Sequence, residues 1–457
     1  MTVSQTPDEA IDPSEQPRQQ TLSTAEPGVK AAFELSWQEL DPMTQCVGLL
    51  LSLFAPAIFR WKWVEFASQL LNWDEADVNQ AKQQFYKWQW LQSVERGEEC
   101  YNVPPLIRRL LREKLDDLDF VAPYSCAFDT VFPETASDRN TEVGQKTIRS
   151  LSPYQGGDIK KAFGTVMVNI AEQIPDSLTD KDIESVKDAI PHLEEVAQNL
   201  TTVVRDEDLL WIFDRLGRFY KAKGSYILAE PWLEQCLAIA QASFGDNHLD
   251  VATSLNNLAE LYYSQKRYSE AEPLLLKALG LRTRFLGNYH PDVATSLNNL
   301  AGLYYAQKRY SEAEPLLLKA LELRTHFLGN YHPDVAATLN NLALLYDAQG
   351  NYSEAETLYV QALELRKRLL GNDHPHVGIT LNNLAGLYCS QGRYTEAEPL
   401  FRQAIEISEQ VLGANHLNSQ IFHKNLAILQ SRIDTNNSWL RMLTKKFWQL
   451  CSDIKSS

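Results

Sequence analysis

The sequence lacks the features that define a membrane-spanning protein, a secreted protein or a nucleotide hydrolase. It has no apolar run of roughly eighteen residues, the length that a transmembrane helix needs. Residues 1–20 are rich in Pro, Gln and acidic side chains and contain no apolar stretch of the kind found in secretory signals. The motif GxxxxGK(S/T) is absent, so the sequence predicts no phosphate-binding loop with its lysine.

Cysteine and positive charge are also scarce. The six cysteines are scattered over 457 residues without a CxxC pair, so we expect reduced, mostly buried thiols and a cytoplasmic protein. Lys and Arg total 43 against 59 Asp and Glu, which gives a net charge of −16. A charge of this sign repels phosphate backbones and anionic lipid headgroups. The composition therefore favours basic or mixed-charge partners over nucleic acid.

What the sequence has in abundance is internal repetition. Residues 250–291 and 292–333 differ at only four positions, and the same 42-residue frame continues through 334–375 and 376–417. A fixed period of this length is typical of solenoids, whose stacked repeats form an extended binding surface. The four differences between the first two copies are Glu260 to Gly302, Ser264 to Ala306, Gly280 to Glu322 and Arg284 to His326.

Each repeat contains two segments with apolar residues at helical spacing. Small alanines in both segments let the two helices approach closely. The stretch Ser269–Glu272 has the pattern of a capping box that begins the second helix. Gly287 ends that helix and Pro291 begins the next one. The packing residues of the first copy are Leu258, Ala259, Tyr262, Ala271, Leu275 and Ala278.

This pattern resembles the tetratricopeptide repeat (TPR). The 42-residue period and the consensus TSLNNLAxLYxxQxxYxEAEPL are similar to the kinesin-light-chain type of that repeat. The resemblance covers residues 210–433, and it implies an all-α superhelix that binds other proteins. The coiled-coil heptads through which a kinesin light chain joins its motor are absent from the sequence.

The segment before the repeats predicts a winged-helix domain, because three amphipathic helices are followed by a hairpin about Arg96-Gly97. Its stretch VKAAFELSWQELDPMTQCVGLLLSLFAP resembles the winged helix of NB-ARC/STAND regulators, and AIPHLEEVAQNL at 189–200 resembles their bridge to a TPR array. Without a phosphate-binding loop, the resemblance implies the sensor half of such a regulator. An NTPase on a separate chain is then a candidate partner.

The predicted fold is all-α: a TPR superhelix, or α-solenoid, with a small N-terminal winged-helix domain. The predicted segments are a disordered tail (1–30), the winged-helix domain (31–116), a linker (117–157), a helical bridge (158–208), the TPR array (209–433; one degenerate repeat, four full repeats and one partial repeat) and a C-terminal capping helix (434–457).

Asparagine pairs on the first helix of each repeat are the main candidate binding residues. An amide carries both a donor and an acceptor, so a row of amides can pair with a peptide backbone whatever its side chains. In TPR superhelices that hold extended peptides, the second asparagine of each pair has this role. The alternative is that the amides tie neighbouring repeats together. The candidates are Asn256, Asn257, Asn298, Asn299, Asn340, Asn341, Asn382, Asn383 and Asn425.

Tyr263, Tyr305, Asp347 and Cys389 occupy one equivalent position, which we expect to face the same groove. Because this position varies between repeats, we expect it to select among ligand side chains. The tyrosines would supply amphipathic contact area. The alternative is that these residues are ordinary solvated packing residues.

The repeated histidines do not predict a metal site. One histidine per repeat, such as His248 and His290, lies too far from the next to share an ion, so we expect these residues to order the turn before each first helix. No Ser/His/Asp or Cys/His set stands out from the repeats. The sequence therefore predicts no catalytic residue, no metal, no cofactor and no enzymatic activity.

These features predict a protein–protein interaction scaffold, in signalling or regulation, whose concave TPR groove binds a peptide or protein segment. One alternative is a DNA-binding regulator that reads duplex DNA through the winged helix and senses through the repeats. Its predicted helix at 74–90, however, carries only Lys82 and Lys87 as basic residues. The other alternative is a kinesin-light-chain-like cargo adaptor.

Overall fold

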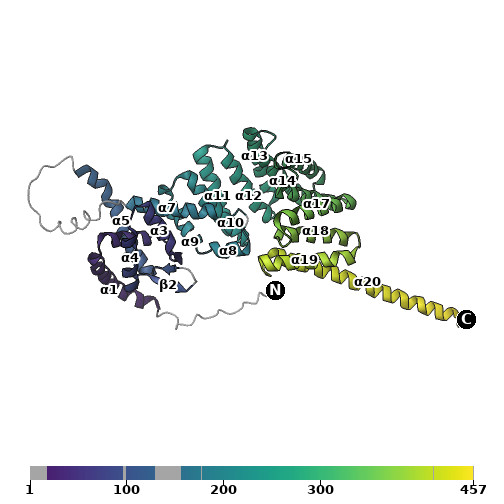
Figure 1. The fold of residues 1–457 in the computed structure, drawn as a ribbon, viewed down its shortest axis with the longest axis horizontal. Coiled ribbons are helices and arrows are strands. Elements are labelled where there is room, and N and C mark those ends of the chain that lie inside the picture. The colour runs from purple at the N-terminus through teal and green to yellow at the C-terminus, as the bar shows by residue number, and fades with distance from the viewer. Residues whose placement is uncertain (1–17, 96–98, 129–155, 177, 415, 456–457) are drawn as a thin grey trace, which may run out of the picture. The chain divides into compact units, whose positions relative to one another are not determined.

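The computed structural model describes residues 18–95, 99–128, 156–176, 178–414 and 416–455. These residues are mostly helical and divide into two compact units, which are described separately (Figure 1). Unit 1 contains residues up to 170 together with 188–205, and unit 2 contains 171–187 together with the residues from 206 onward. Within the part of the chain that the structure describes, no helix combines the length and apolarity needed to cross a bilayer.

Unit 1 has the predicted order of helices followed by a hairpin, with one further strand. Within its described residues, β1, β3 and β2 pair antiparallel in that spatial order. The predicted turn at Arg96-Gly97 lies outside the described residues. The elements are α1 (Arg18–Glu39), α2 (Pro42–Leu51), β1 (Phe59–Arg60), α3 (Trp61–Leu70), α4 (Glu75–Lys87), β2 (Gln92–Glu95), β3 (Glu99–Asn102), α5 (Pro105–Phe128), most of α7 (Gly156–Gln173), α9 (Ile190–Asn199) and a short 3-10 helix (Thr201–Val203).

A buried histidine joins α9 to the loop after α2. His192 is fully buried, and its Nδ1 accepts a hydrogen bond from the backbone N–H of Ala55 at 2.9 Å. Its Nε2 lies 3.0 Å from the carbonyl oxygen of Ile58, so Nε2 carries the proton and donates. Glu195 on the same helix also pairs with Arg108 of α5 at 2.9 Å. The segment 189–200 is therefore packed into unit 1.

Three predicted boundaries in the terminal and linker segments are wrong. The tail expected at 1–30 becomes helical at Arg18, where α1 begins; residues 1–17 lie outside the described residues. Helix α5 continues to Phe128, so the first part of the predicted linker is helical. At the other end, α20 runs from Leu417 to Lys455 as one helix of 39 residues, so no break separates the partial repeat from the predicted capping helix at 434–457.

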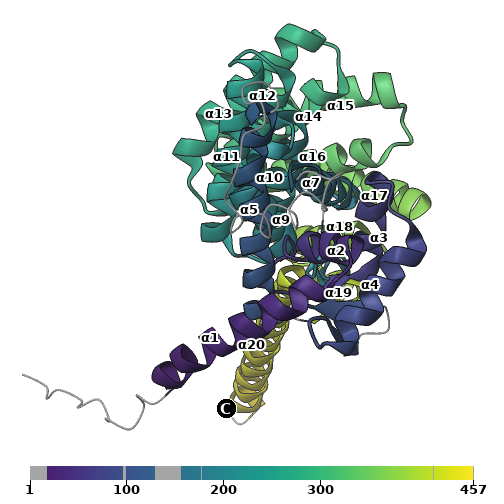
Figure 2. The same cartoon turned by 90° about the vertical axis from the view of Figure 1, so that its left-hand side faces the viewer.

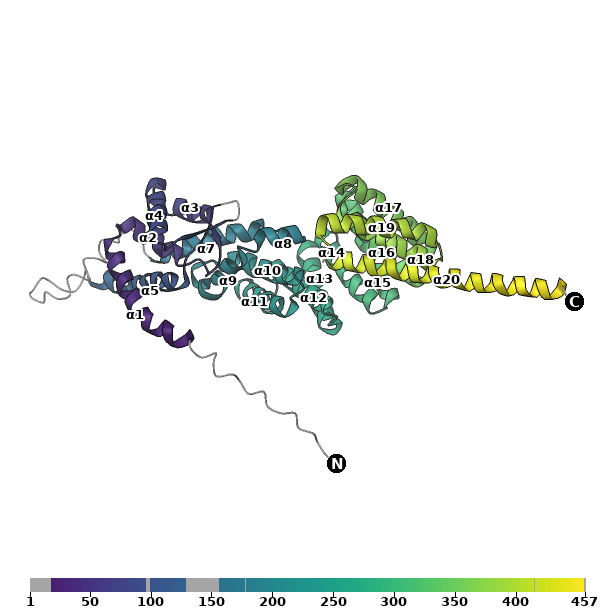
Figure 3. The same cartoon turned by 90° about the horizontal axis from the view of Figure 1, so that it is seen from below.

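The uninterrupted α20 has a simple cause, because no Gly or Pro lies between Leu417 and Lys455 to end it. Its first part packs on α19 through Phe422, Leu426 and Leu429. Figure 3 shows the helix continuing past α18 and α19.

Unit 2 consists of successive helical hairpins, each formed by a first helix and a second helix. The first helices of neighbouring hairpins also contact one another, so they form one common face of the array (Figure 2). The elements are α8 (Asp180–Val186) and then the pairs α10 (Asp206–Ala222) with α11 (Tyr226–Phe244), α12 (Leu249–Ser264) with α13 (Tyr268–Leu286), α14 (Pro291–Ala306) with α15 (Tyr310–Leu328), α16 (Pro333–Gln349) with α17 (Tyr352–Leu370), and α18 (Pro375–Ser390) with α19 (Tyr394–Leu412), followed by α20.

Alternating small and large side chains pack these hairpins together, as the repeat pattern predicts. Ala259 and Ala271 are fully buried where α12 meets α13, and Leu275 fills the space beside them. The equivalent residues of the next repeat belong to the same continuous core. A larger side chain at either alanine would force the two helices apart, at about 1–3 kcal/mol.

Histidines begin the first helices. The Nδ1 atom of His248 accepts a hydrogen bond from the backbone N–H of Asp250 at 3.2 Å. This confirms that these histidines order the turn, since the bond satisfies one of the unpaired N–H groups at a helix start. The same cap occurs at His290, His332, His374 and His416.

The second helices begin without a side-chain cap, so the predicted capping box at Ser269–Glu272 is wrong. Helix α13 starts at Tyr268, and the side chain of Arg267 before it makes no capping bond. The backbone N–H groups of Glu270 and Ala271 donate instead to the carbonyl oxygen of Arg267, at 3.2 and 3.1 Å. Glu270 and Glu272 of this motif instead form ion pairs with Arg267 and Arg309.

An arginine links the start of a second helix to the preceding hairpin. Arg309 binds Glu272 of the preceding repeat at 2.9 Å and Glu312 of its own helix at 2.7 Å. Its guanidinium also lies 3.9 Å from the centre of the Tyr304 ring. The equivalent residues Arg267 and Arg393 make the same set of contacts.

The third full repeat has Asn351 at this position, although the acceptors and the ring are present. There Glu314 accepts hydrogen bonds from the Tyr346 hydroxyl and the Gln349 amide, both at 3.3 Å. We predict that Asn351→Arg completes the contact set and raises the melting temperature of the array by a few degrees. The gain, measured by circular dichroism, should disappear in a Glu314→Gln background; an equal gain there would show that the arginine acts elsewhere.

Acid should destabilise unit 1 through His192. Burial lowers the pKa of this imidazole to about 4 from the usual 6.5. As the pH falls from 6.5 towards 4, His192 binds a proton in the unfolded chain but not in the folded protein. The free energy of unfolding therefore drops by roughly 3 kcal/mol. Urea unfolding followed by tryptophan fluorescence measures the drop. In His192→Asn, which cannot titrate, the pH dependence should be smaller by that amount, and identical pH profiles would contradict the assignment.

Candidate functional site

Two grooves lie on the face formed by the first helices, called here the first-helix face. The first groove has a volume of about 450 Å³ and the second about 320 Å³; Leu344 lines both. The first groove is lined by Lys221, Ala259, Glu260, Tyr263, Ser264, Leu275, Asn298, Asn299, Ala301, Gly302, Tyr305, Leu317, Asn341 and Leu344. The second is lined by Leu344, Asp347, Asn382, Asn383, Gly386, Cys389, Ser390, Phe401, Asn425, Ile428, Leu429 and Arg432.

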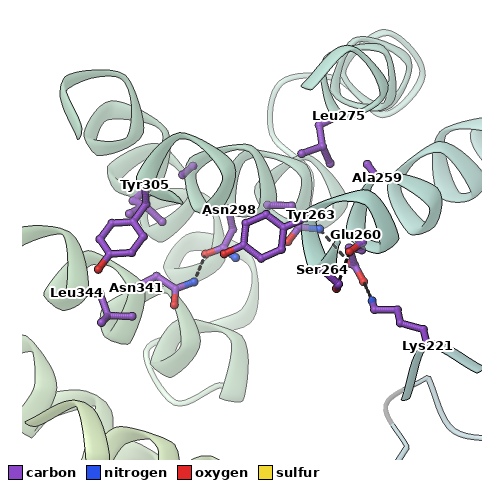
Figure 4. Close-up of a pocket in the computed structure, with 14 residues that line it drawn as sticks. Lys221, Ala259, Glu260, Tyr263, Ser264, Leu275, Asn298, Tyr305, Asn341 and Leu344 are labelled. Atoms are coloured by element: carbon purple, nitrogen blue, oxygen red, sulfur yellow. Dashed lines mark hydrogen bonds and ion pairs between the residues drawn. The ribbon is translucent and has the colours of Figure 1, made fainter. Parts of the chain in front are cut away.

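Tyrosines and amides form the polar part of the first groove (Figure 4). Tyr263 is 41% exposed, and Tyr305 occupies the equivalent place one repeat later. Glu260 is paired with Lys221 at 2.7 Å, so this carboxylate is neutralised within the protein. Burial raises the pKa of both tyrosines, which keeps the phenols protonated as hydrogen-bond donors.

The asparagines form a hydrogen-bonded ladder between repeats. The amide of Asn341 donates to the side-chain oxygen of Asn298 in the preceding repeat at 3.0 Å. At the start of the series the amide of Asn257 donates to Asp214 at 2.7 Å. The other bonds of the ladder run from Asn299 to Asn256 at 2.9 Å, from Asn383 to Asn340 at 3.3 Å and from Asn425 to Asn382 at 2.9 Å.

The ladder corrects part of the predicted site. Asn256, Asn257 and Asn340 are 4–7% exposed and line neither groove, so they do not present amides to a ligand. Their neighbours in the ladder take up their hydrogen-bonding groups, because a buried amide without a partner would be unstable. The remaining candidate asparagines line the grooves while also bonding across repeats: Asn298, Asn299, Asn341, Asn382, Asn383 and Asn425.

Glycine leaves the middle of the first groove open. Gly302 stands at the position that Glu260 and Leu344 occupy in the repeats on either side, and a Cβ atom added there would meet nothing within 4 Å. Sequence analysis missed this residue as part of the site. The signal was present, since Glu260 to Gly302 is one of only four differences between two otherwise identical repeats.

A family model for the tetratricopeptide repeat matches residues 208–284, 257–325, 292–368, 335–410 and 376–435. These matches follow the hairpins from α10 to the beginning of α20. The chain is a tetratricopeptide-repeat protein. Arrays of this TPR fold are typically non-enzymatic scaffolds that bind proteins or peptides, and the sequence prediction of a TPR superhelix is confirmed.

Solved structures of other TPR proteins are similar to this one. A candidate kinesin light chain of Podosopora anserina with nearly identical TPR-like repeats is 29% identical over 43% of this chain and 92% of its own, with a TM-score of 0.36. BtubC (BKLC) from P. vanneervenii is 24% identical over 50% and 90%, with a TM-score of 0.40.

A signal-transduction ATPase (STAND) protein with a TPR sensor, from Pyrococcus horikoshii, is 15% identical over 88% of this chain and 61% of its own, with a TM-score of 0.40. None of the curated proteins matches the chain significantly.

The N-terminal unit of this TPR protein offers little to a DNA duplex at the helix before its hairpin. Lys82 of α4 pairs with Glu99 of β3, and its ammonium lies 4.7 Å from the centre of the Trp61 ring and 5.0 Å from that of Tyr101. One of the two lysines on which the DNA-binding alternative depends is thus committed to contacts within unit 1.

Removing one amide of the ladder should destabilise the TPR array. Asn382→Ala deletes the acceptor of the Asn425 amide, and we expect the free energy of unfolding to fall by about 1–2 kcal/mol because a partly buried donor loses its partner. Urea denaturation followed by circular dichroism measures the change. Adding Asn425→Ala to this variant should cost less than Asn425→Ala costs alone. Strictly additive effects would mean that the two amides are not coupled.

Proposed function

We propose that the first-helix face of the TPR array binds an extended segment of another protein, and that the chain acts as an interaction scaffold. The observation that supports this most directly is the open first groove, where two tyrosines and three amides surround the space above Gly302. In TPR superhelices this face is the concave side. A rigid, already ordered surface leaves most of the loss of conformational freedom to the ligand, which favours binding.

The asparagine ladder determines which hydrogen-bonding groups remain available to a ligand. Asn299 and Asn341 each donate a hydrogen bond to the preceding repeat, and Asn298 accepts one, so a ligand meets the remaining oxygen and N–H sites of these three amides. Tyr263 and Tyr305 add ring area and hydroxyl donors at a spacing of one repeat. A segment that extends along several repeats would match this spacing better than a compact ligand.

A regulatory role is the setting that this architecture favours, since a helical unit with a winged-helix layout precedes the TPR array. In this proposal the TPR array selects the partner, and unit 1 has a regulatory role that responds to binding. Neither unit catalyses a reaction. A separate NTPase chain is one partner that would fit such a division of labour, and the cytoplasm is the compartment that fits the scattered thiols. Cys46, Cys100 and Cys236 are buried and free.

Filling the groove should weaken binding without destabilising the fold. Gly302→Glu places in the groove the residue that the preceding repeat carries, and it should slightly stabilise α14 because glycine is a poor helix former. The matched control is Gly280→Glu, which adds the same charge to an exposed position of α13 where Glu322 stands one repeat later.

The test uses peptides selected from a randomised display library on the full-length protein, with affinity measured by fluorescence anisotropy. We expect Gly302→Glu to weaken binding by about tenfold or more and Gly280→Glu to leave it unchanged. Equal affinity of both variants for every selected peptide would contradict binding in the first groove. Alanine substitutions in the ladder are less suitable, since they disturb the stacking of the repeats.

A further inference from the structure

Asp347 is an unpaired carboxylate on the first-helix face. Its side chain lies in the wall of the second groove and has no hydrogen-bond or ion-pair partner among the described residues. Two other carboxylates of the first helices are neutralised, since Asp214 binds Arg218 and Glu260 binds Lys221, both at 2.7 Å. Burial raises the pKa of Asp347 above its usual value, as expected for a carboxylate that has lost water without gaining a counter-charge.

A second polar group without a partner lies in the same hairpin, on α17. Tyr359 is fully buried, and its hydroxyl has no hydrogen-bond partner within the described part of the protein. Burial, and then the charge of Asp347, raises the pKa of Tyr359, and the same two causes act with the Tyr310 phenol on Tyr305.

The hydroxyl of Tyr359 is specific to this repeat. The equivalent positions of the neighbouring repeats hold apolar residues that line the grooves: Leu275, Leu317 and Phe401. The packing of a hairpin therefore does not require a hydroxyl at this position. A buried hydroxyl without a partner destabilises a protein, so its presence points to an interaction that is completed on binding.

We infer that Asp347 binds a basic side chain, arginine in preference to lysine, of the segment held on the first-helix face. This inference rests on the proposed function. Asp347 accepts hydrogen bonds from the ligand cation, and Tyr359 acts as a positioning residue by donating a hydrogen bond to the same carboxylate. A guanidinium can pair with a carboxylate through two parallel N–H···O hydrogen bonds, which an ammonium cannot form, so arginine is preferred over lysine. The net charge of −16 attracts such a ligand over a longer range.

A double-mutant cycle between protein and peptide tests the assignment. Among the peptides selected on the full-length protein, the strong binders should share an arginine or lysine. Replacing that arginine by citrulline, which keeps the shape and removes the charge, should weaken binding to the wild type by about tenfold. The same replacement should have little effect on binding to Asp347→Asn. Asp373→Asn, which removes an equal charge from an exposed loop, is the matched control and should behave as the wild type does.

Tyr359→Phe separates recognition from folding. It removes a buried hydroxyl without a partner, so the free protein should be as stable as the wild type or more stable, while the arginine peptide should bind several-fold more weakly. Tyr352→Phe, at an exposed position of the same helix, should change neither quantity. A loss of stability in Tyr359→Phe would mean that the hydroxyl serves the fold alone and would overturn its assigned role.

The possible failures are distinguishable. Gly302→Glu could abolish binding while the citrulline replacement weakens binding to the wild type and to Asp347→Asn equally. The groove would then bind a segment, but Asp347 would not recognise its positive charge, and the inference would be wrong. If the selected peptides lack a basic residue, the inference is wrong in the same way. If Gly302→Glu has no effect on any peptide, the proposed function itself is wrong.

Discussion

The array depends on the close approach of helices at small residues, because no hairpin can bury its apolar residues alone. Ala259, Ala301, Ala343 and Ala385 are fully buried at the same position of successive first helices. Each lets a second helix come near enough for leucine or an aromatic ring to fill the adjoining space. Stability is therefore shared between neighbours along the chain, as expected for a solenoid.

Polar contacts then fix how one hairpin sits on the next. The amide ladder runs through the first helices, while buried arginines tie α13, α15 and α17 to the following hairpin; Arg324, for example, donates to the Thr338 hydroxyl at 2.7 Å. Burial lowers the pKa of Arg324, so this contact holds a partly desolvated charge. Buried polar groups are stable only in an arrangement that satisfies their hydrogen bonds, and a shift between hairpins would break these bonds. The first-helix face is therefore expected to be rigid.

A rigid face with few differences between repeats concentrates selectivity at the positions that vary. Gly302 opens one groove, and Asp347 introduces a charge where two repeats have tyrosine. In the proposed function, the near-identical repeats form the scaffold and the residues that differ between them contact the ligand specifically. A Cβ atom at Gly302 would meet nothing within 4 Å, so a substitution there can leave the packing of α14 intact.

The sequence predicts the hairpins well because the 42-residue period, the alanines and the Gly and Pro residues at helix ends act locally. It does not predict the partners of long side chains. The glutamates of Ser269–Glu272 match a capping box by spacing, yet Glu270 and Glu272 bind arginines that no local pattern identifies. The uninterrupted α20 was predictable from its lack of Gly and Pro, but the repeat frame suggested a boundary inside it.

The amides show the limit most clearly. A row of asparagines at fixed spacing is compatible with ligand contact and with inter-repeat bonding, and only the three-dimensional packing distinguishes which amides are buried. Tyr359 differs from its equivalents, and Gly302 differs from Glu260 and Leu344 in the repeats on either side, in ways that are visible in the sequence. Their meaning depends on knowing that Gly302 and the equivalents of Tyr359 line a groove.

A methyl-labelled NMR titration of the full-length protein with a selected peptide tests the central claim most directly. We expect the methyl signals of Leu317 and Leu344, which line the first groove, to shift as peptide is added. The methyl signals of Leu276 and Leu318, which are exposed on the second helices, should stay in place. Shifts confined to Leu276 and Leu318 would show that the second helices carry the binding surface and would contradict the account.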